Sequence, residues 1–457
     1  MGEGSMSKKN TADLTHGPVL RQLITLVIPL FITNLVQQLF STADLLIVGN
    51  FSTDSETVLA AVSSSANLSS LLITLVLAMA VGNNVLCANL VGAGATVELR
   101  RVMHTSLLVA LLLGIVFVGV GLPLAPAILR LIHCPEEILD AASLYIRLFF
   151  VGQIPLTIFN FGAGILRAHG DTRRPMNILL GSGALKALLN LLFVAVFKLD
   201  VLGVGLATII SNAAAALVVL FILFSPHGDF RLSLAELRLS PKESFRIMRV
   251  GLPMGINDTL FNLSSVLVQN SINQFGATVV AGDGVASNLT AFIYVFFNSF
   301  HHALVSFAGQ NYGAKKFGRI REAMWKTIAA LLLILVVLAL FITFFPTALL
   351  SIYAEDAAVV QAGVPRLIVF AWGFLINVFP TLSSSCLFGM GRTGSCSFVN
   401  MLCNLIPRYL WIVLLFPHFS NLWFLLLCYP ASWCINTAAN AVFLSLTFRK
   451  EQKKLLQ

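Results

Sequence analysis

The chain has 457 residues, of which 57% are hydrophobic and only 11% are charged, and its formal net charge is +9. Soluble domains carry about 25% charged residues, so this composition excludes an ordinary soluble protein. A nucleic-acid-binding domain would gather its basic residues in one patch, whereas here they are scattered over short segments between apolar runs. We therefore expect the lipid bilayer, and no nucleic acid, as a partner.

Twelve long apolar stretches follow one another along the chain, and ionisable residues are rare inside them. A run of about 20 apolar residues matches the roughly 30 Å hydrocarbon core of a bilayer. Such runs cross it as helices, because a helix satisfies its own backbone hydrogen bonds. We predict an all-α membrane protein with twelve transmembrane helices. The predicted spans are 21–49, 57–90, 102–132, 138–164, 175–197, 201–225, 247–275, 279–308, 324–350, 359–386, 396–416 and 421–447.

The charges between the spans alternate in sign along the chain. One set of segments carries basic clusters such as Arg173-Arg174 and Lys315-Lys316, and the alternate set is mostly acidic, as at Glu136-Glu137. Cytoplasmic loops hold the excess of lysine and arginine. The alternation therefore predicts that both termini are cytoplasmic, and an even number of spans agrees with that.

The two halves of the chain repeat each other. Gly92-Ala93 recurs as Gly313-Ala314, and Gly170-x-Thr172 recurs as Gly391-x-Thr393, all at an offset of 221 residues. Such parallel repeats predict two six-helix lobes with a substrate site between them. The predicted organisation is an N-terminal tail at 1–20, an N-terminal lobe at 21–225, a cytoplasmic linker at 226–246, a C-terminal lobe at 247–447 and a basic tail at 448–457.

Four ionisable residues, namely Asp44, Lys186, Asp258 and Arg408, lie well inside the predicted spans. An unpaired charge at such depth costs at least about 3 kcal/mol. Pairing, protonation or a water-filled cavity must relieve that cost. We hypothesise one polar cavity in each half, with Asp44 and Lys186 in the first and Asp258 and Arg408 in the second. Purely structural charge pairs are the alternative.

Two further arginines, Arg147 and Arg366, lie close to the outer starts of their spans. A long basic side chain can reach the membrane surface from there while its stem stays in apolar surroundings. We expect both to snorkel or to cap a helix end, and Asp283 to belong to an acidic outer segment.

Amide and aromatic side chains accompany the deep charges. Amides can join helices or contact a substrate, and aromatic rings can line a pocket for flat organic cations. A direct contact between Asp44 and Lys186 needs the lysine to lean outward; failing that, a water molecule or Asn190 must bridge them. Asn257 precedes Asp258 in the second polar site. The candidate substrate contacts are Asn34, Gln37, Gln38, Gln269, Asn273, Tyr294 and Trp372.

Three motifs carry a family resemblance: QQLFSTADLLIVG from Gln37 to Gly49, LRAHGDTRRPM from Leu166 to Met176, and GQNYGAKK from Gly309 to Lys316. On these motifs the chain resembles the multidrug and toxic compound extrusion (MATE) family of cation-coupled exporters, in its bacterial multidrug branch. The resemblance implies two lobes around a cleft, alternating access powered by H⁺ or Na⁺, and the cytoplasmic (inner) membrane of a bacterium. We expect the glycines of these motifs to form tight turns whose basic residues contact lipid headgroups.

The resemblance also identifies Asp44 with the family's first-helix aspartate. Where family members often carry an asparagine and an aspartate in the fifth helix, this chain has Lys186 and Asn190. The ammonium group takes the electrostatic place of a bound Na⁺, and one carboxylate ligand is missing. We therefore expect H⁺ as the coupling ion, an Asp44–Lys186 proton switch, no cofactor and no resident metal. A sodium site near Asp258 stays open, and a cleft within one chain suits a monomer.

The leading interpretation is an antiporter that exports amphipathic, often cationic, small molecules. A lipid-linked precursor flippase of the same architecture is the alternative. Its anionic cargo would favour a strongly cationic cleft, whereas the four deep charges of this chain sum to zero. An intramembrane enzyme is disfavoured, because the chain has no HExxH or GxSxG motif. A channel does not need the twofold repeat.

Overall fold

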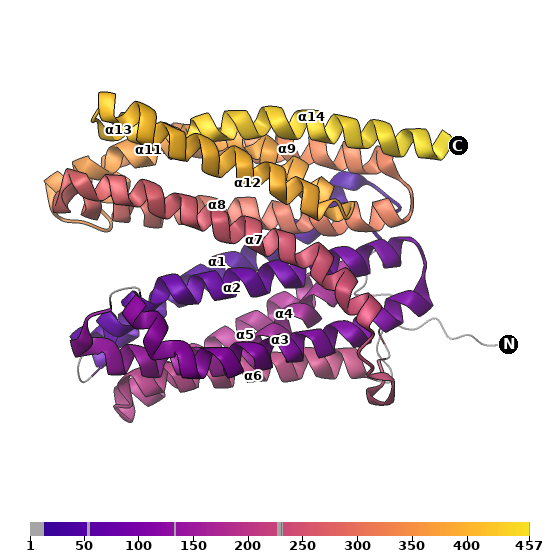
Figure 1. The fold of residues 1–457 in the computed structure, drawn as a ribbon, viewed down its shortest axis with the longest axis horizontal. Helices are drawn as coiled ribbons and strands as arrows, with labels where there is room; N and C mark the ends of the chain where they lie inside the picture. Colours follow the sequence, from indigo (N-terminus) through magenta and orange to yellow (C-terminus); the bar gives the residue numbers. More distant parts are fainter. Residues whose placement is uncertain (1–12, 53–54, 132–133, 226–229, 231, 457) are drawn as a thin grey trace. The chain divides into compact units, whose positions relative to one another are not determined.

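The computed structural model describes residues 13–52, 55–131, 134–225, 230 and 232–456, and these residues are helical with short connections. The axes of the long helices lie roughly parallel to one another within each half of the chain (Figure 1). Within the described residues they are α1 (Val19–Phe51), α2 (Ser55–Gly92), α3 (Thr96–Leu131), α4 (Leu139–Ala168), α5 (Arg173–Asn190), α6 (Asp200–Phe224), α7 (Pro241–Ile272), α8 (Ala277–Gly313), α9 (Phe317–Phe344), α11 (Ala357–Gly389), α12 (Thr393–Leu410) and α14 (Cys428–Leu456).

These helices confirm the predicted all-α membrane fold. Among the described residues, 11 helices are long and apolar enough to cross a membrane. The exception is α7, whose mean hydropathy is lowered by Asn257, Asp258, Asn262, Gln269 and Asn270. Two predicted spans are interrupted near one end, which yields the short helices α10 (Pro346–Leu350) and α13 (Leu422–Leu426). Proline at the start of α10 suits that break, because the first residues of a helix need no backbone N–H.

The chain folds into two compact units, and α1 and α7 each contribute to both. The first unit contains Ile32–Gly255, and the second contains Leu14–Phe31 together with the chain from Ile256 onward. The predicted lobe boundary at 226–246 therefore differs from the observed division. The reason is that α1 and α7 are continuous helices whose halves pack in different units.

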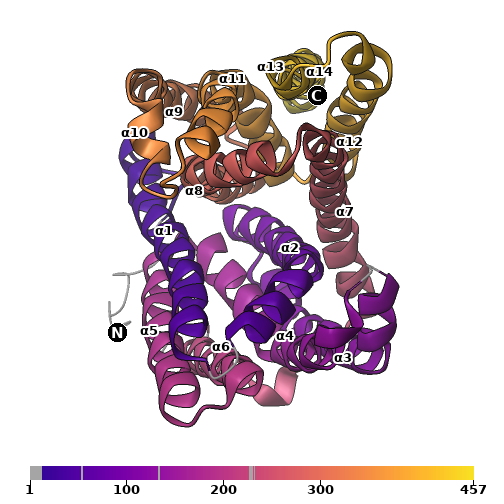
Figure 2. The ribbon, with the colours of Figure 1, turned by 90° about the vertical axis from the view of Figure 1, so that its left-hand side faces the viewer.

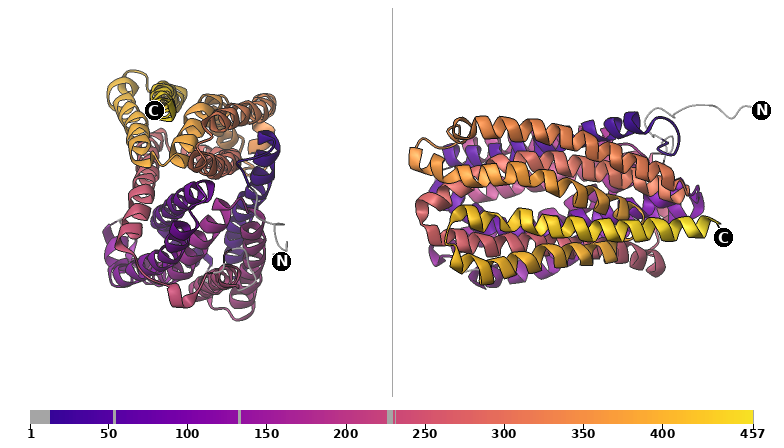
Figure 3. Two further views of the ribbon diagram at one scale, coloured as in Figure 1. Left: turned by 90° about the vertical axis from the view of Figure 1, so that its right-hand side faces the viewer. Right: turned by 90° about the horizontal axis from the view of Figure 1, so that it is seen from above.

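One central helix organises each unit. In the first unit α4 contacts α2, α3 and α6 and lies among them (Figure 2). Its glycines allow close approach, since a Cβ at Gly164 would lie 2.9 Å from the carbonyl oxygen of Ala80 in α2. In the second unit α11 contacts α8, α9 and α14. A Cβ at Gly282 would lie 2.5 Å from the carbonyl oxygen of Val359, so α8 and α11 also pack backbone to backbone. The yellow helix α14 runs beside α12 (Figure 3).

The internal repeat extends to the backbone of the turns. Gly170 and Gly391, which are 221 residues apart, have φ angles of 77° and 73°. Gly94 has φ 67°, and the residue 221 positions later is Lys315, with φ 58°. Glycine adopts this left-handed conformation at low cost. The predicted glycine turn is present at Gly170, whereas in the GQNYGAKK motif Lys315 forms the turn and Gly309 lies within α8.

The turn at Lys315 and the residues next to it bind the start of the described chain. Leu14 is 1% exposed, its N–H donates to Gln310 Oε1 (3.0 Å), and its carbonyl oxygen accepts from Asn311 Nδ2 (3.0 Å). Lys316 Nζ donates to the carbonyl oxygen of Thr15 (2.9 Å), and Arg319 Nη1 donates to that of Gly17 (2.9 Å). The GQNYGAKK motif thus binds the protein's own chain, a role that was not predicted from the sequence.

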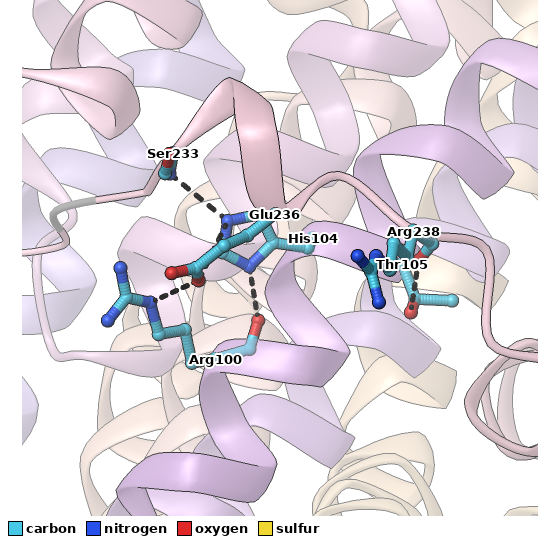
Figure 4. A network of polar contacts seen from close by, with 6 residues as sticks. All are labelled: Arg100, His104, Thr105, Ser233, Glu236 and Arg238. Carbon is cyan, nitrogen blue, oxygen red and sulfur yellow. Dashed lines mark hydrogen bonds and ion pairs between the residues drawn. The ribbon is translucent and has the colours of Figure 1, made fainter.

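The linker between the halves is fastened to the start of α3 through His104 (Figure 4). His104 Nδ1 lies 2.7 Å from the carbonyl oxygen of Arg100, and the backbone N–H of Ser233 donates to His104 Nε2 (3.1 Å). The ring thus contacts the backbone on both sides, at Arg100 of α3 and at Ser233 of the linker. Arg100 also pairs with Glu236 (2.9 Å), and Thr105 Oγ1 donates to the carbonyl oxygen of Arg238 (3.2 Å).

We expect His104→Ala to release this linker. The change removes two hydrogen bonds and leaves a backbone N–H without its acceptor, which costs about 1–3 kcal/mol. Opening of the linker should rise about tenfold, since 1.4 kcal/mol corresponds to that factor. Limited trypsin cleavage after Arg238 in detergent measures the opening, with cleavage after Lys450 as the internal control. An unchanged rate at Arg238 would contradict this role of His104.

Candidate functional site

The first unit brings together Asp44 of α1 with Lys186 and Asn190 of α5. Lys186 Nζ donates to Asp44 Oδ2 in an ion pair, and Asn190 Nδ2 donates to Asp44 Oδ1 (2.6 Å). Lys186 and Asn190 are one helical turn apart, so they present both donors to the same carboxylate. The predicted contact between Asp44 and Lys186 is therefore present, and Asn190 binds the other carboxylate oxygen.

This polar cluster is only partly accessible. The side chains of Lys186 and Asp44 are 25% and 18% exposed, and Asn190 is fully buried. Among the described residues, Asn190 Oδ1 has no hydrogen-bond partner. The cluster is electrically neutral while Asp44 is ionised and Lys186 is protonated, so its burial is tolerated only while the two side chains stay together.

An apolar cluster closes one side of the Asp44 cluster. Val48 lies one turn beyond Asp44, and Val194 lies one turn beyond Asn190. Both are buried, and they pack with Val58, Val201 and Val204. Beyond Asn190 the chain continues as a π-helical turn, Leu191–Val196. A π-helical turn interrupts the regular backbone hydrogen bonding, and such turns are frequent at functional sites.

Polar contacts hold the adjoining ends of α1 and α6 beyond the valine cluster. Ser52 Oγ donates to Asp200 Oδ1, and Lys198 Nζ donates to the carbonyl oxygen of Phe51 (2.9 Å). These contacts fasten the end of α1 to the connection between α5 and α6. Lys198 is exposed and binds a neutral acceptor, so it differs from Lys186 in both respects.

The second unit does not bring Asp258 and Arg408 together, which corrects the predicted cavity. Asp258 is exposed and accepts from Asn257 Nδ2 (3.0 Å). Arg408 is 0% exposed, with Nη1 donating to Ser264 Oγ (2.7 Å) and Nε donating to Ser432 Oγ (3.1 Å). The helical turn explains the difference, because Ser264 lies about 120° around α7 from Asp258 at 100° per residue.

Two aromatic rings lie against the Arg408 guanidinium. Its Cζ lies 4.8 Å from the ring centre of Phe261 and 4.5 Å from that of Tyr429. Tyr429 stands 4.7 Å from Phe370, ring centre to ring centre, and Phe370 lies 4.8 Å from Cζ of Arg366. Cation–π contact is strongest where the cation is shielded from water. The second unit thus holds two arginines beside a pair of aromatic rings, Phe370 and Tyr429, that are tilted by 57° to each other.

Arg366 has a carboxylate partner that the sequence reading missed. Arg366 Nη1 binds Asp283 Oδ2 (2.7 Å), and Nη2 donates to Ser287 Oγ (3.3 Å). Asp283 is 2% exposed, so the expected outer-segment acid is a buried one. The available signal was the spacing of Asp283 and Ser287, which are four residues apart and share one face of α8.

The other sequence-predicted residues are divided between the two units. In the first unit Asn34 and Gln38 are half-buried and Gln37 is exposed. In the second, Gln269 Nε2 donates to Asn273 Oδ1 (3.2 Å). Tyr294 packs edge-to-face on Phe374 (5.0 Å), whereas Trp372 is 43% exposed and donates through Nε1 to Thr343 Oγ1 of α9 (3.0 Å). Trp372 therefore ties α11 to α9.

Buried amides that were not predicted hold the second unit together. Asn440 Nδ2 donates to Asn400 Oδ1 and to Asn436 Oδ1, both at 2.8 Å. Asn400 Nδ2 donates in turn to Ser384 Oγ (2.9 Å). The network links α11, α12 and α14, as expected for amides that join helices in an apolar environment.

Comparison with known proteins decides the family. The MatE family model matches residues 29–192 and 253–410. The chain belongs to the MATE family. The first matched segment contains the Asp44–Lys186 pair, and the second contains Arg408 with Phe261 and Ser264.

Relatives and solved structures agree with this MATE-family assignment. The chain is 27% identical to "Probable multidrug resistance protein YoeA" of Bacillus subtilis (strain 168) over 366 residues, covering 78% of each protein. It is 24% identical to "Multidrug export protein MepA" of Staphylococcus aureus (strain N315) over 430 residues, covering 93% of this chain and 94% of that protein. A solved outward-facing multidrug resistance MATE family transporter of the MOP superfamily matches with a TM-score of 0.89 at 21% identity, covering 98% of this chain and 100% of that chain. That likeness confirms the fold.

Proposed function

We propose that this MATE-family protein exports amphipathic, often cationic, small molecules in exchange for protons, by alternating access of its two lobes. Membership of the family and the names of the bacterial relatives support drug export. The alternation of basic and acidic segments supports a bacterial cytoplasmic membrane with both termini in the cytoplasm. Small-molecule cargo and a monomeric transporter are part of the same proposal.

The observation that carries the coupling proposal is the ammonium group of Lys186 on the Asp44 carboxylate. A bound Na⁺ needs several oxygen ligands and a site that its positive charge can enter. Here one cation already occupies the carboxylate, and Asn190 Nδ2, a donor, takes its second oxygen. Both positions that a metal ion would use are therefore filled by hydrogen-bond donors, which favours a proton as the coupling ion.

The proposed coupling step is the separation of the ion pair. While Asp44 and Lys186 are paired, their charges cancel. When α1 and α5 move apart, each charge loses its partner in apolar surroundings, and that state is costly. Proton uptake by the Asp44 carboxylate, or proton release from the Lys186 ammonium, removes one of the two charges. Each proton that crosses the membrane supplies about 2.3 kcal/mol per 100 mV of membrane potential, plus the pH gradient.

Dye transport under separated gradients tests the proposal. A fluorescent cationic dye is added to inside-out vesicles that contain the protein, and either a pH gradient or a Na⁺ gradient is imposed across their membrane. We expect dye movement under the pH gradient without Na⁺, and none under the Na⁺ gradient alone. A strict requirement for Na⁺ would reject proton coupling, while no dye movement under either gradient would reject cation export.

A further inference from the structure

A groove runs between α5 and α6, which lie side by side in the first unit (Figure 2). Its volume is about 430 Å³, within the range of cavities that hold small ligands. Most of its lining is apolar, and the proposed coupling step uses none of the residues that shape it. These residues are Arg174, Asn177, Gly181 and Leu185 of α5, with Ala214 and Val218 of α6.

Small side chains keep this groove open. A Cβ at Gly181 would meet no neighbouring atom within 4 Å, and Ala214 contributes a single methyl group to the other wall. At the offset of 221 residues, Arg174 and Gly181 correspond to Ser395 and Leu402. The matching helix of the second unit, α12, therefore has neither the charge nor the small residue. The repeated fold thus does not require their combination in α5.

The groove has the depth of one membrane leaflet. Arg174 and Leu185 are 11 residues apart on α5, which corresponds to about 16 Å at 1.5 Å per residue. Half of the roughly 30 Å hydrocarbon core is about 15 Å. Leu217, Val218 and Phe221 of α6 are exposed beside the groove. Because lipid tails are as apolar as leucine, these side chains suit a surface that faces acyl chains.

Arg174 gives one end of the groove a positive charge. Its Nε lies 3.3 Å from Oδ2 of the buried Asp171, and its side chain is partly exposed. Asp171 Oδ1 also accepts the backbone N–H groups of Arg173 (3.1 Å) and Arg174 (3.0 Å). The Arg173 side chain is exposed, so two guanidinium groups accompany one carboxylate. Arginine recognises phosphate groups through paired, charge-assisted hydrogen bonds.

We infer that this groove binds one phospholipid of the cytoplasmic leaflet that has an anionic headgroup. The phosphate lies against Arg173 and Arg174. One acyl chain lies between α5 and α6, over Gly181 and Ala214, and ends near Leu185. The alternation of charges along the chain places the Arg174 end of α5 at the cytoplasmic surface, where anionic lipids are found. The inference concerns equilibrium binding and does not depend on the proposed export of cations.

Thermal unfolding of the delipidated full-length protein in detergent tests the site. The probes are phosphatidylglycerol, phosphatidylcholine with the same acyl chains, and glycerol phosphate, which has no acyl chain. A ligand that binds only the folded state raises Tm. We expect phosphatidylglycerol to raise Tm at a mole fraction at least tenfold lower than phosphatidylcholine needs, with no effect of glycerol phosphate. Equal responses to the two lipids, or a full response to glycerol phosphate, would contradict the inference.

Two variants and a matched control assign the effect to the groove. Gly181→Leu fills it with the side chain that α12 carries at the matching position, so the apparent affinity for phosphatidylglycerol should fall at least tenfold. Gly119→Leu adds the same side chain at an exposed glycine of α3, where a Cβ also meets no neighbouring atom within 4 Å, and should keep the wild-type affinity.

Arg174→Gln should remove the preference for phosphatidylglycerol over phosphatidylcholine. Gly181→Leu decides the question if Arg174→Gln does not fold, because it leaves the ion pair with Asp171 in place. The inference is overturned if phosphatidylglycerol does not raise Tm of the wild type. It is also overturned if Gly181→Leu binds this lipid like the wild type, or if Gly119→Leu weakens binding as much as Gly181→Leu does.

Discussion

Replacing Lys186 by glutamine is expected to lower proton-driven dye export at least tenfold, and replacing Asp44 by asparagine should do the same. Lys186 Nζ binds Asp44 Oδ2, and this pair is half-buried beside the fully buried Asn190. Either change leaves one charge in apolar surroundings without its partner, and it also removes one of the two groups that exchange a proton. A tenfold loss corresponds to about 1.4 kcal/mol, less than the roughly 2.3 kcal/mol that one proton supplies at 100 mV. Initial rates in vesicles under a fixed pH gradient measure the effect.

Lys198 provides the matched control for this prediction. It lies beyond the valine cluster, in the connection between α5 and α6. Its side chain is exposed and binds the backbone carbonyl oxygen of Phe51 rather than a carboxylate. Lys198→Gln removes the same charge without separating an ion pair, so it should retain at least half of the wild-type rate. Equal rates for Lys186→Gln and the wild type, at equal protein levels, would contradict the coupling role of the pair.

The second large effect is expected from Asp283→Ala. The change leaves Arg366 buried without its carboxylate, and breaking a buried pair on one side costs about 3–5 kcal/mol. Asp283 is 2% exposed and connects α8 to α11, which is the central helix of the second unit. We expect Tm in detergent to fall by about 6–20 °C, on the scale of 2–4 °C per kcal/mol for domains of this size. Thermal unfolding followed by size-exclusion chromatography measures it.

A double variant separates loss of charge balance from loss of packing. Asp283→Leu combined with Arg366→Met removes both charges and keeps apolar volume between the helices. Such replacements of buried ion pairs are often neutral or stabilising. The double variant should therefore recover most of the lost Tm. A double variant as unstable as Asp283→Ala would show that the helices need the side-chain shapes and not the balanced charge.

The first-unit site could be predicted because its two charges are isolated in long apolar runs. Asp44 and Lys186 had no nearby partner in sequence, so the cost of an unpaired charge in lipid pointed from each to the other. The helix positions could likewise be predicted from the long apolar runs, and the repeat from glycine motifs that recur at a fixed offset. The assignment of the two halves of α1, and of α7, to different units could not be predicted. A continuous apolar helix gives no sequence signal of which neighbours each half packs against.

The same reasoning failed in the second unit, for a physical reason. Depth alone suggested that Asp258 and Arg408 would pair, but the rotation of α7 turns Ser264 and Phe261 toward the arginine instead. Asp283 was assigned to an outer segment because it lies near the outer start of its predicted span, but it is 2% exposed and pairs with Arg366 of α11.

Proton release on cargo binding tests the central claim most directly. The purified protein is placed in weakly buffered detergent solution with a pH indicator, and tetraphenylphosphonium is added as the cationic probe. If the cation displaces the proton held at the Asp44–Lys186 pair, the wild type releases protons in proportion to the probe bound. The same addition to Asp44→Asn should release none. No release from the wild type despite measured binding, or equal release from Asp44→Asn, would contradict the account.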